Sequence, residues 1–298
     1  MGDNRAMKSG LAIVNAYYVL PGAKHFYERM AEELAKRGVA LGLATNAEIF
    51  SYVNSEGNLD GIVPGVDFVL YLDKDLYASY MLEMKGVRLF NSARSIELCD
   101  DKMLTHISLV NNGIKMPKTI SGPLNYSIEE NQAFIKELED KLEFPFVMKG
   151  NFGSLGREVF LIENHDQLVA KEKEIGHSPR LFQELIASSK GHDYRLIVIG
   201  GHFVAGMKRM SDNGDFRSNI GLGGHGEKIQ MPKAYIETAE KAAKLLHLDY
   251  CGVDILEGPN GEPILDEVNS NAFIEGVEKV TGINVAGAYA DHIVKSIY

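Results

Sequence analysis

The sequence is poor in cysteine, in long apolar runs and in positive charge, and each shortage removes a class of protein. Its only cysteines, Cys99 and Cys251, form no C-x-x-C pair, which argues against a disulfide framework or a structural zinc site. No stretch of the sequence approaches the roughly 20 apolar residues that span a membrane. We therefore expect a protein of the reducing cytoplasm that has no membrane partner.

Positive charge is outnumbered, with 31 Lys and Arg against 41 Asp and Glu, a formal net charge of −10. This balance argues against an extended nucleic-acid surface, although it leaves room for a local basic site that binds a phosphorylated ligand. Apolar residues make up 45% and charged residues 24% of the chain, which is typical of a soluble globular protein. Its 298 residues suffice for two or three packed units.

Several catalytic signatures are also missing. The chain has no G-x-S-x-G nucleophile elbow, and none of its nine histidines forms a metal-binding spacing. It has neither the Walker A pattern G-x-x-x-x-G-K-[ST] nor a dinucleotide fingerprint. Hydrolases and the commonest nucleotide-binding folds are therefore not favoured.

The first third of the chain alternates between strand and helix patterns, and we take residues 1–98 as an N-terminal α/β domain. An amphipathic segment at 24–37 predicts a helix that ends at Gly38. The alternation favours a small parallel sheet. Strands are expected at 11–15, 39–44, 66–72 and 87–91, with a second helix at 76–85.

The remainder divides into a central α+β unit, residues 99–186, and a C-terminal unit, residues 187–298. The central unit is expected to hold helices at 101–112, 127–142 and 166–175 and strands at 144–149, 157–162 and 181–186. In the last unit, Gly200 and Gly201 indicate a hairpin between strands 193–200 and 202–209. A helix at 235–247, strands at 251–257 and 263–269, and a helix at 284–297 complete it. The fold class is thus α/β combined with α+β.

The last strand pair carries a candidate metal site. Glu267 and Asn269 are two residues apart on one strand and point to the same face, and an antiparallel partner can bring Asp254 opposite them. Two carboxylates and an amide oxygen suit Mg²⁺ bridged by nucleotide phosphates. Solvated acids on a plain hairpin are the alternative, but the apolar neighbours indicate largely buried strands, where carboxylates need a counter-charge.

Two further segments are candidates for phosphate binding. A strand ends at Lys149 and enters a loop that contains Gly153, Ser154 and Gly156, whose backbone N–H groups can meet phosphate oxygens. A cationic cluster, Lys208, Arg209 and Arg217, can stabilise charge on a transferring phosphoryl group. A glycine-rich hairpin and solvated surface charges are the alternatives for these two segments.

Read together and in order, these blocks resemble the ATP-grasp superfamily, in particular the RimK-type α-L-glutamate ligases. The resemblance covers roughly residues 66–298, and its phosphate loop is similar to that of LysX-type amino-acid ligases. Its most specific parts are GDFRSN (214–219) and the final series of blocks. The blocks are DK (101–102), VMKGNFGSLGREV (147–159), FQELI (182–186), GHDYRLIVIG (191–200), GDFRSN, GVDIL (252–256), DEVNSN (266–271) and EGVEKVTGI (275–283).

The resemblance implies an ATP-grasp fold, with an N-terminal pre-ATP-grasp domain, and a role for each matching residue. Lys102 and Lys149 would bind phosphates under the loop that holds Gly153, Ser154 and Gly156, and Lys208 would assist. Gln183, Glu184 and Leu185 would meet adenine, and Asp193 the ribose. Arg209, Arg217 and Asn219 would face the γ-phosphate and an acyl phosphate. Asp254, Glu267 and Asn269 would hold two Mg²⁺ ions, which Mn²⁺ could replace.

The implied activity is ADP-forming ligation of a carboxylate to an amine, through an acyl phosphate. A glutamate-like amino acid would be added to a small molecule, peptide or protein. The family pattern continues E-V-N with a small residue and then Ser-Pro-Gly, whereas this chain has Asn271, Ala272 and Phe273 after Ser270, so the substrates stay open. So do a catalytically silent nucleotide-binding regulatory module, a small-molecule kinase, and assembly as a homodimer or homotetramer.

Overall fold

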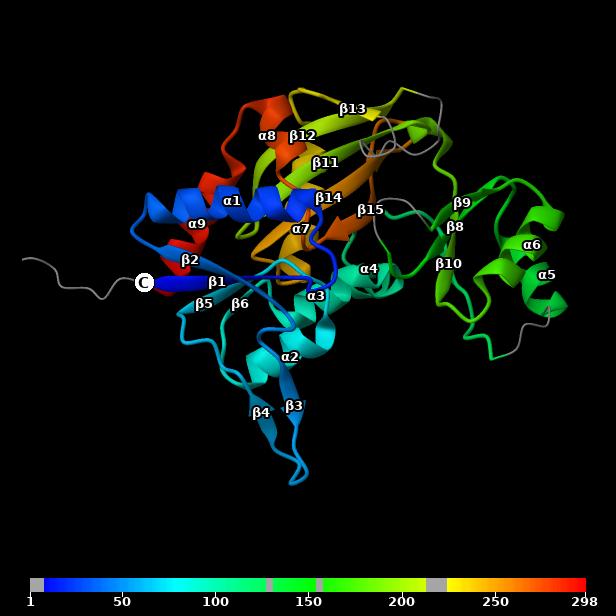
Figure 1. Ribbon diagram of the computed structural model, residues 1–298. Helices are drawn as coiled ribbons and strands as arrows, with labels where there is room; N and C mark the ends of the chain where they lie inside the picture. The colour runs from blue at the N-terminus through cyan, green and yellow to red at the C-terminus, as the bar shows by residue number, and fades with distance from the viewer. Residues whose placement is uncertain (1–7, 127–130, 154–157, 213–223) are drawn as a thin grey trace, which may run out of the picture.

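The computed structural model describes residues 8–126, 131–153, 158–212 and 224–298. Within these ranges the chain builds a four-stranded parallel sheet, two antiparallel sheets and a separate two-stranded hairpin, with helices packed around them (Figure 1). Four residues with predicted roles, Ser154, Gly156, Arg217 and Asn219, lie outside the described residues.

The first sheet has the strand order β2-β1-β5-β6, and all its pairs are parallel, as the alternating pattern predicts. Helix α1 begins at a proline in its first turn, and Gly38 follows it with a φ of 73°, the left-handed conformation that glycine adopts readily. The elements are β1 (Ser9–Val14), α1 (Pro21–Ala35), β2 (Ala40–Thr45), β5 (Phe68–Tyr71), α2 (Leu76–Met84), β6 (Leu89–Phe90) and α3 (Ala93–Asp100).

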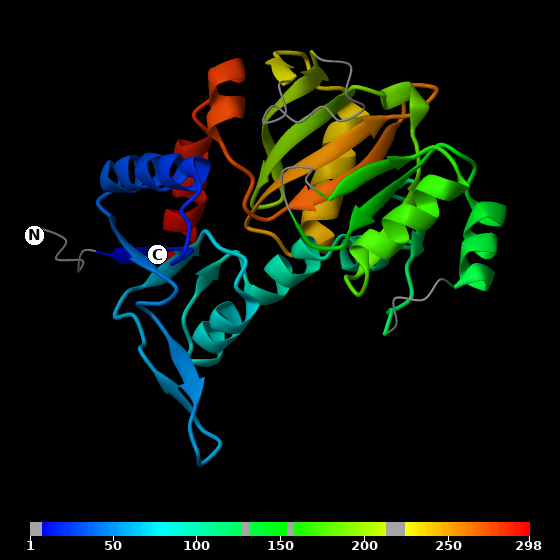
Figure 2. The same cartoon turned by 45° about the vertical axis from the view of Figure 1, so that its right-hand side comes forward.

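A hairpin of β3 (Ser51–Val53) and β4 (Leu59–Gly61), which the sequence analysis does not predict, interrupts this domain. It projects away from the other elements in both ribbon views (Figures 1 and 2). Lys85, which directly follows α2, donates from Nζ to Ser51 Oγ at 2.8 Å and so ties the base of the hairpin to the domain.

The central unit is an antiparallel sheet in the order β7-β10-β8-β9. Its own apolar core contains Phe146, Leu168 and Phe182. The unit comprises α4 (Lys102–Leu109), β7 (Thr119–Ser121), α5 (Gln132–Lys141), β8 (Phe146–Gly150), β9 (Val159–Ile162), α6 (His165–Ile175) and β10 (Arg180–Glu184). A short 3₁₀ turn, Ala187–Ser189, leads out of it.

The C-terminal unit is an antiparallel sheet in the order β13-β12-β11-β14-β15. Gly200 and Gly201, with φ of 57° and 77°, form the tight turn of the predicted hairpin between β11 and β12. Helix α7 packs on one face of this sheet, where its alanines enter the core. The elements are β11 (His192–Ile199), β12 (His202–Ser211), β13 (Gly224–Glu227), α7 (Lys233–Leu245), β14 (Tyr250–Glu257), β15 (Pro263–Asn269), α8 (Glu275–Thr281) and α9 (Val285–Ile297).

The last two helices return to the N-terminal domain. One apolar core joins α1, β1 and β5 to β11, α8 and α9, and within it the rings of Phe26, Tyr250 and Tyr289 pack together. Figures 1 and 2 show α9 beside α1. The borders at 98 and 186 remain predictions, but the core of the first unit extends into the third.

No helix in the described parts of the chain combines the length and the apolar character needed to cross a membrane.

Candidate active site

A cavity of about 630 Å³ opens where the three units meet. Its walls come from the central sheet, from the sheet of β11, β12, β14 and β15, and from loops of the N-terminal domain. Most of the predicted site residues that the structure describes line it, although they come from distant parts of the sequence. These are Lys102, Lys149, Gly153, Gln183, Glu184, Leu185, Asp193, Arg209, Asp254, Glu267 and Asn269.

Lys208 is the exception among the described site residues, because it does not line the cavity. It alternates with Arg209 on β12, so the two side chains leave opposite faces of the sheet. Its Nζ lies 5.5 Å from the centre of the Tyr194 ring. Tyr194 belongs to the core beneath α7, so Lys208 is on that side of the sheet.

Asp254 lies at the centre of a buried ion-pair cluster. It faces Arg195 across β14 and β11, and Arg195 Nη2 donates to Asp254 Oδ2 at 2.8 Å. Arg209 Nη2 lies 3.0 Å from the same oxygen, and its Nε donates to Asp193 Oδ1 at 2.6 Å. Burial alone would raise the pKa of Asp254, but the two guanidinium groups hold it below its ordinary value. The cluster is thus a rigid, charged floor for the cavity.

The predicted metal ligands meet as the strand pairing requires. Asp254 is opposite Glu267, and Asn269 pairs with Gly252 one step along the ladder. The described residues contain no group of three or more His, Cys, Asp or Glu side chains arranged to hold a metal. The predicted set has only two carboxylates plus an amide, and Asp254 shares its oxygens with two arginines. Oxygen-only donors at the cavity wall fit a hard cation such as Mg²⁺.

A β-bulge adds a second acid that the alternation rule does not predict. The register shifts beside Asp254, so Asp266 and Glu267 both line the cavity although they are neighbours on β15. Asp266 Oδ1 accepts from Lys149 Nζ at 2.7 Å. Lys102 Nζ lies 3.7 Å from Glu267 Oε1 and donates to the Gly153 carbonyl at 3.3 Å. Both predicted phosphate lysines therefore stand next to the acids of β15.

The strand that ends with Gln183 and Glu184 forms another wall. The Gln183 side chain is buried, and its Nε2 contacts His106 Nε2 at 3.1 Å and Thr119 Oγ1 at 3.0 Å. Glu184 Oε1 accepts from the Lys118 backbone N–H at 2.8 Å. These bonds hold the strand next to the cavity.

Sequence reasoning missed three charged residues that line this cavity: Arg195, Asp266 and Asp73. Arg195 had a readable signal, because it is two residues from Asp193 on a strand and therefore shares its face. Asp266 reaches the cavity through a bulge, and Asp73 follows β5 in another domain. Neither placement is encoded in a local pattern.

Two antiparallel sheets that enclose a cavity with lysines from one side and acids from the other define an ATP-grasp protein. The chain belongs to the RimK-like ATP-grasp family, whose domain matches residues 99–293.

Curated relatives and a solved structure agree with this assignment. Human beta-citrylglutamate synthase B is 34% identical over 221 residues, which cover 74% of this chain and 56% of the relative. A probable alpha-L-glutamate ligase from Maridesulfovibrio salexigens is 34% identical over 218 residues, 72% of this chain and 69% of that protein. The chain thus spans little more than half the length of the human relative.

A solved complex of the ATP-grasp ligase PsnB with a phosphomimetic variant of its minimal precursor, Mg and ADP has a TM-score of 0.71. The match covers 98% of this chain and 99% of that one, at 18% identity. This similarity establishes the fold.

Proposed function

We propose that this chain is an ADP-forming carboxylate–amine ligase that adds a glutamate-like amino acid to the carboxylate of a small molecule, peptide or protein. The observation that carries the proposal is the convergence of Lys102, Lys149, Asp254, Glu267 and Asn269 on one cavity. The names of the glutamate ligase and beta-citrylglutamate synthase relatives support the reaction class. A cytoplasmic location is part of the proposal.

The nucleotide would lie between the two antiparallel sheets. Residues 183–185, at the end of the central strand, would meet adenine, and Asp193 the ribose. Lys102 and Lys149 would bind phosphate oxygens, a role that charge-assisted hydrogen bonds favour. Ser154 and Gly156 in the phosphate loop, and Arg217 and Asn219 near the transferred phosphate, keep their predicted roles, and Lys208 would assist from outside the cavity wall.

Asp254, Glu267 and Asn269 would hold two Mg²⁺ ions, or Mn²⁺ in their place. The metal would neutralise phosphate charge and polarise the γ-phosphoryl group. Arg195 and Arg209 keep Asp254 ionised, and Lys102 stands beside Glu267, so the protein supplies a fixed field for the charge that develops.

The reaction needs no side-chain nucleophile. A substrate carboxylate oxygen attacks the γ-phosphorus, the bond to the β-phosphate oxygen breaks, and ADP leaves. The amine then attacks the acyl carbon, loses a proton and displaces phosphate, which forms the amide. Positioning and electrostatics account for the catalysis.

The decisive test compares Glu267→Ala with Glu262→Ala, a control on the same hairpin whose side chain pairs with Lys115 outside the cavity. We expect Mg²⁺-dependent ADP release, screened over amino acids with candidate carboxylates, to disappear in Glu267→Ala and to persist in Glu262→Ala. Wild-type rates for Glu267→Ala in the presence of a chelator would contradict the metal site.

The product separates the remaining alternatives. A ligase releases ADP and phosphate and makes an amide, whereas a small-molecule kinase makes a stable phosphorylated product without the amine. A regulatory module would bind Mg·ATP and release no ADP. Mass spectrometry of the product therefore decides among them.

A further inference from the structure

The cavity continues beyond the predicted nucleotide site into a second compartment. Its walls are the loop after β1, the loop after β5 and the segment after β15. Among the described residues its side chains include Asn15, Asp73, Asn271, Phe273 and Glu275. None of them carries a role in the binding of ATP or metal.

Asp73 is held in this compartment by neutral donors. Asn15 and Asn46 donate from Nδ2 to its Oδ2 at 3.2 and 3.0 Å, and the Lys74 backbone N–H donates to its Oδ1 at 2.7 Å. Within the described parts of the chain Asp73 forms no ion pair. Burial raises its pKa, and the nearby Asp75 and Asp100 add to the effect.

The wall opposite Asp73 is the segment at which this chain departs from the family pattern. Asn271 Nδ2 donates to the Asp73 carbonyl at 3.0 Å. The Phe273 ring packs so closely on Gly22 that a Cβ there would lie 2.5 Å from it. The chain-specific residues and the N-terminal loops thus fit one another, and the frame around Asp73 is rigid.

The charges of the compartment favour a positive group. Its one lysine, among the described lining residues, is Lys74, whose Nζ lies 2.6 Å from Asp100. Asp73 and Glu275 are both acidic. A carboxylate that lacks a cationic partner gains most from a ligand that supplies one.

We propose that Asp73 binds the ammonium group of the amine co-substrate and selects for it. The proposal rests on the ligase function above and deepens it, because it names the residue that recognises the amine. The asparagines hold the carboxylate in place, and the open side of the carboxylate receives the ligand.

The first test uses the wild-type enzyme and pairs of probes that differ only in the charged group. Each amino acid (L-glutamate, L-alanine, L-lysine) is compared with its 2-hydroxy acid for protection against thermal unfolding in the presence of Mg²⁺ and a non-hydrolysable ATP analogue. We expect protection by at least one amino acid and none by its hydroxy partner. Equal protection within every pair, or protection by no amine, overturns the proposal.

The second test uses Asp73→Asn and Asp73→Glu, with Asp60→Asn on the β3–β4 hairpin as the control. We expect the KM for the amine to rise about 10- to 100-fold in Asp73→Asn, the range that the loss of one charge-assisted hydrogen bond predicts. Asp73→Glu, which keeps the charge, should lie between it and the wild type. The KM for ATP should not change.

An unchanged amine KM in Asp73→Asn overturns the role of Asp73. A loss of Mg·ATP binding by the wild type is a different failure, because it contradicts the ligase function and not the recognition of the amine.

Discussion

Arg195 and Arg209 show how single residues set the charge of this site. Each pairs with Asp254, and Arg209 also holds Asp193, so no member of the cluster is a lone buried charge. Removal of one partner from such a cluster costs several kcal/mol, because a charge is left uncompensated. These arginines therefore combine a structural role with an electrostatic one.

Lys149 allows a test at this scale. Lys149→Ala removes a charge-assisted contact worth roughly 1.5–3 kcal/mol, so the Kd for Mg·ATP measured by calorimetry should rise about 10- to 100-fold. Lys115→Ala, in which an exposed lysine paired with Glu262 is lost, should bind like the wild type. If both variants bind ATP equally well, Lys149 does not contact the nucleotide.

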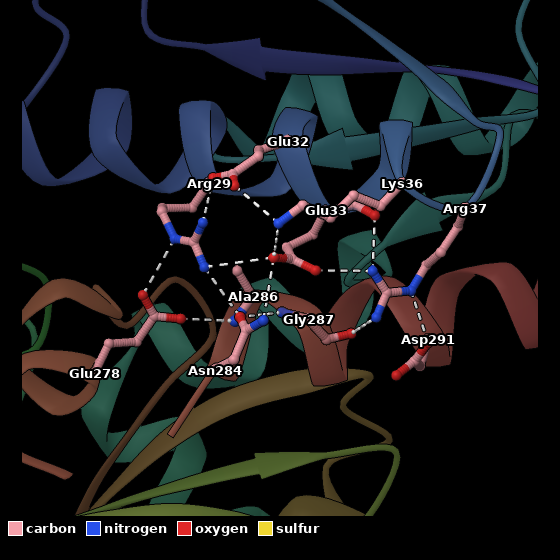
Figure 3. A network of polar contacts seen from close by, with 10 residues as sticks. All are labelled: Arg29, Glu32, Glu33, Lys36, Arg37, Glu278, Asn284, Ala286, Gly287 and Asp291. Carbon is pink, nitrogen blue, oxygen red and sulfur yellow. Dashed lines mark hydrogen bonds and ion pairs between the residues drawn. The ribbon is translucent and has the colours of Figure 1, made fainter. Parts of the chain in front are cut away.

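At the scale of elements, the docking of α9 on α1 depends on a polar network (Figure 3). Glu33 is buried and accepts from Lys36, Arg37 and Asn284 at 2.8, 2.8 and 3.1 Å. Arg37 continues to Asp291 and to the Gly287 carbonyl on α9. Hydrogen bonds from Lys36 and Arg37 lower the pKa of Glu33 to about 2.

This pKa predicts how stability depends on pH. Because the folded-state pKa lies below the model value of 4.5, Glu33 stabilises the fold above pH 4.5, and that contribution is lost as the pH falls toward 2. Glu33→Gln should lower the free energy of unfolding at pH 7 by up to about 3 kcal/mol. Denaturant titrations from pH 7 to pH 2 should show the difference from the wild type shrinking.

Glu32→Gln is the matched control, since its side chain is 52% exposed on the same helix. It should change the pH profile little. A Glu33→Gln profile parallel to that of the wild type would show that the network does not stabilise the docking of α9.

At the scale of the whole molecule, the cores do not follow the order of the chain. The core around Tyr289 joins the first sheet to the C-terminal sheet, while the central unit keeps a core of its own around Phe182. The central unit can therefore open by itself, whereas the other two share their stability.

Two substitutions test this arrangement by hydrogen exchange. Each truncation of a buried aromatic to alanine should cost about 3–5 kcal/mol. Tyr289→Ala should reduce protection in both β1 and β11. Phe182→Ala should reduce it mainly between residues 119 and 184. Loss of protection in β1 without β11 in Tyr289→Ala would show that the two units are energetically independent.

Much of this protein is determined by local sequence. The parallel sheet, the Gly200–Gly201 hairpin and the pairing of Asp254 with Glu267 follow from apolar periodicity and turn residues, which act over a few positions. Ordered motifs indicated the family for the same reason, because each is a short stretch whose chemistry is readable by itself.

Tertiary structure alone decided the rest. The return of α9 to α1, the bulge that turns Asp266 into the cavity and the position of Asp73 beside Asn271 all depend on contacts between residues far apart in the chain. Such contacts form only when whole elements pack, and no local pattern encodes them. The sequence therefore predicts the chemistry of the nucleotide site, whereas the proposed site for the amine emerges only from the folded molecule.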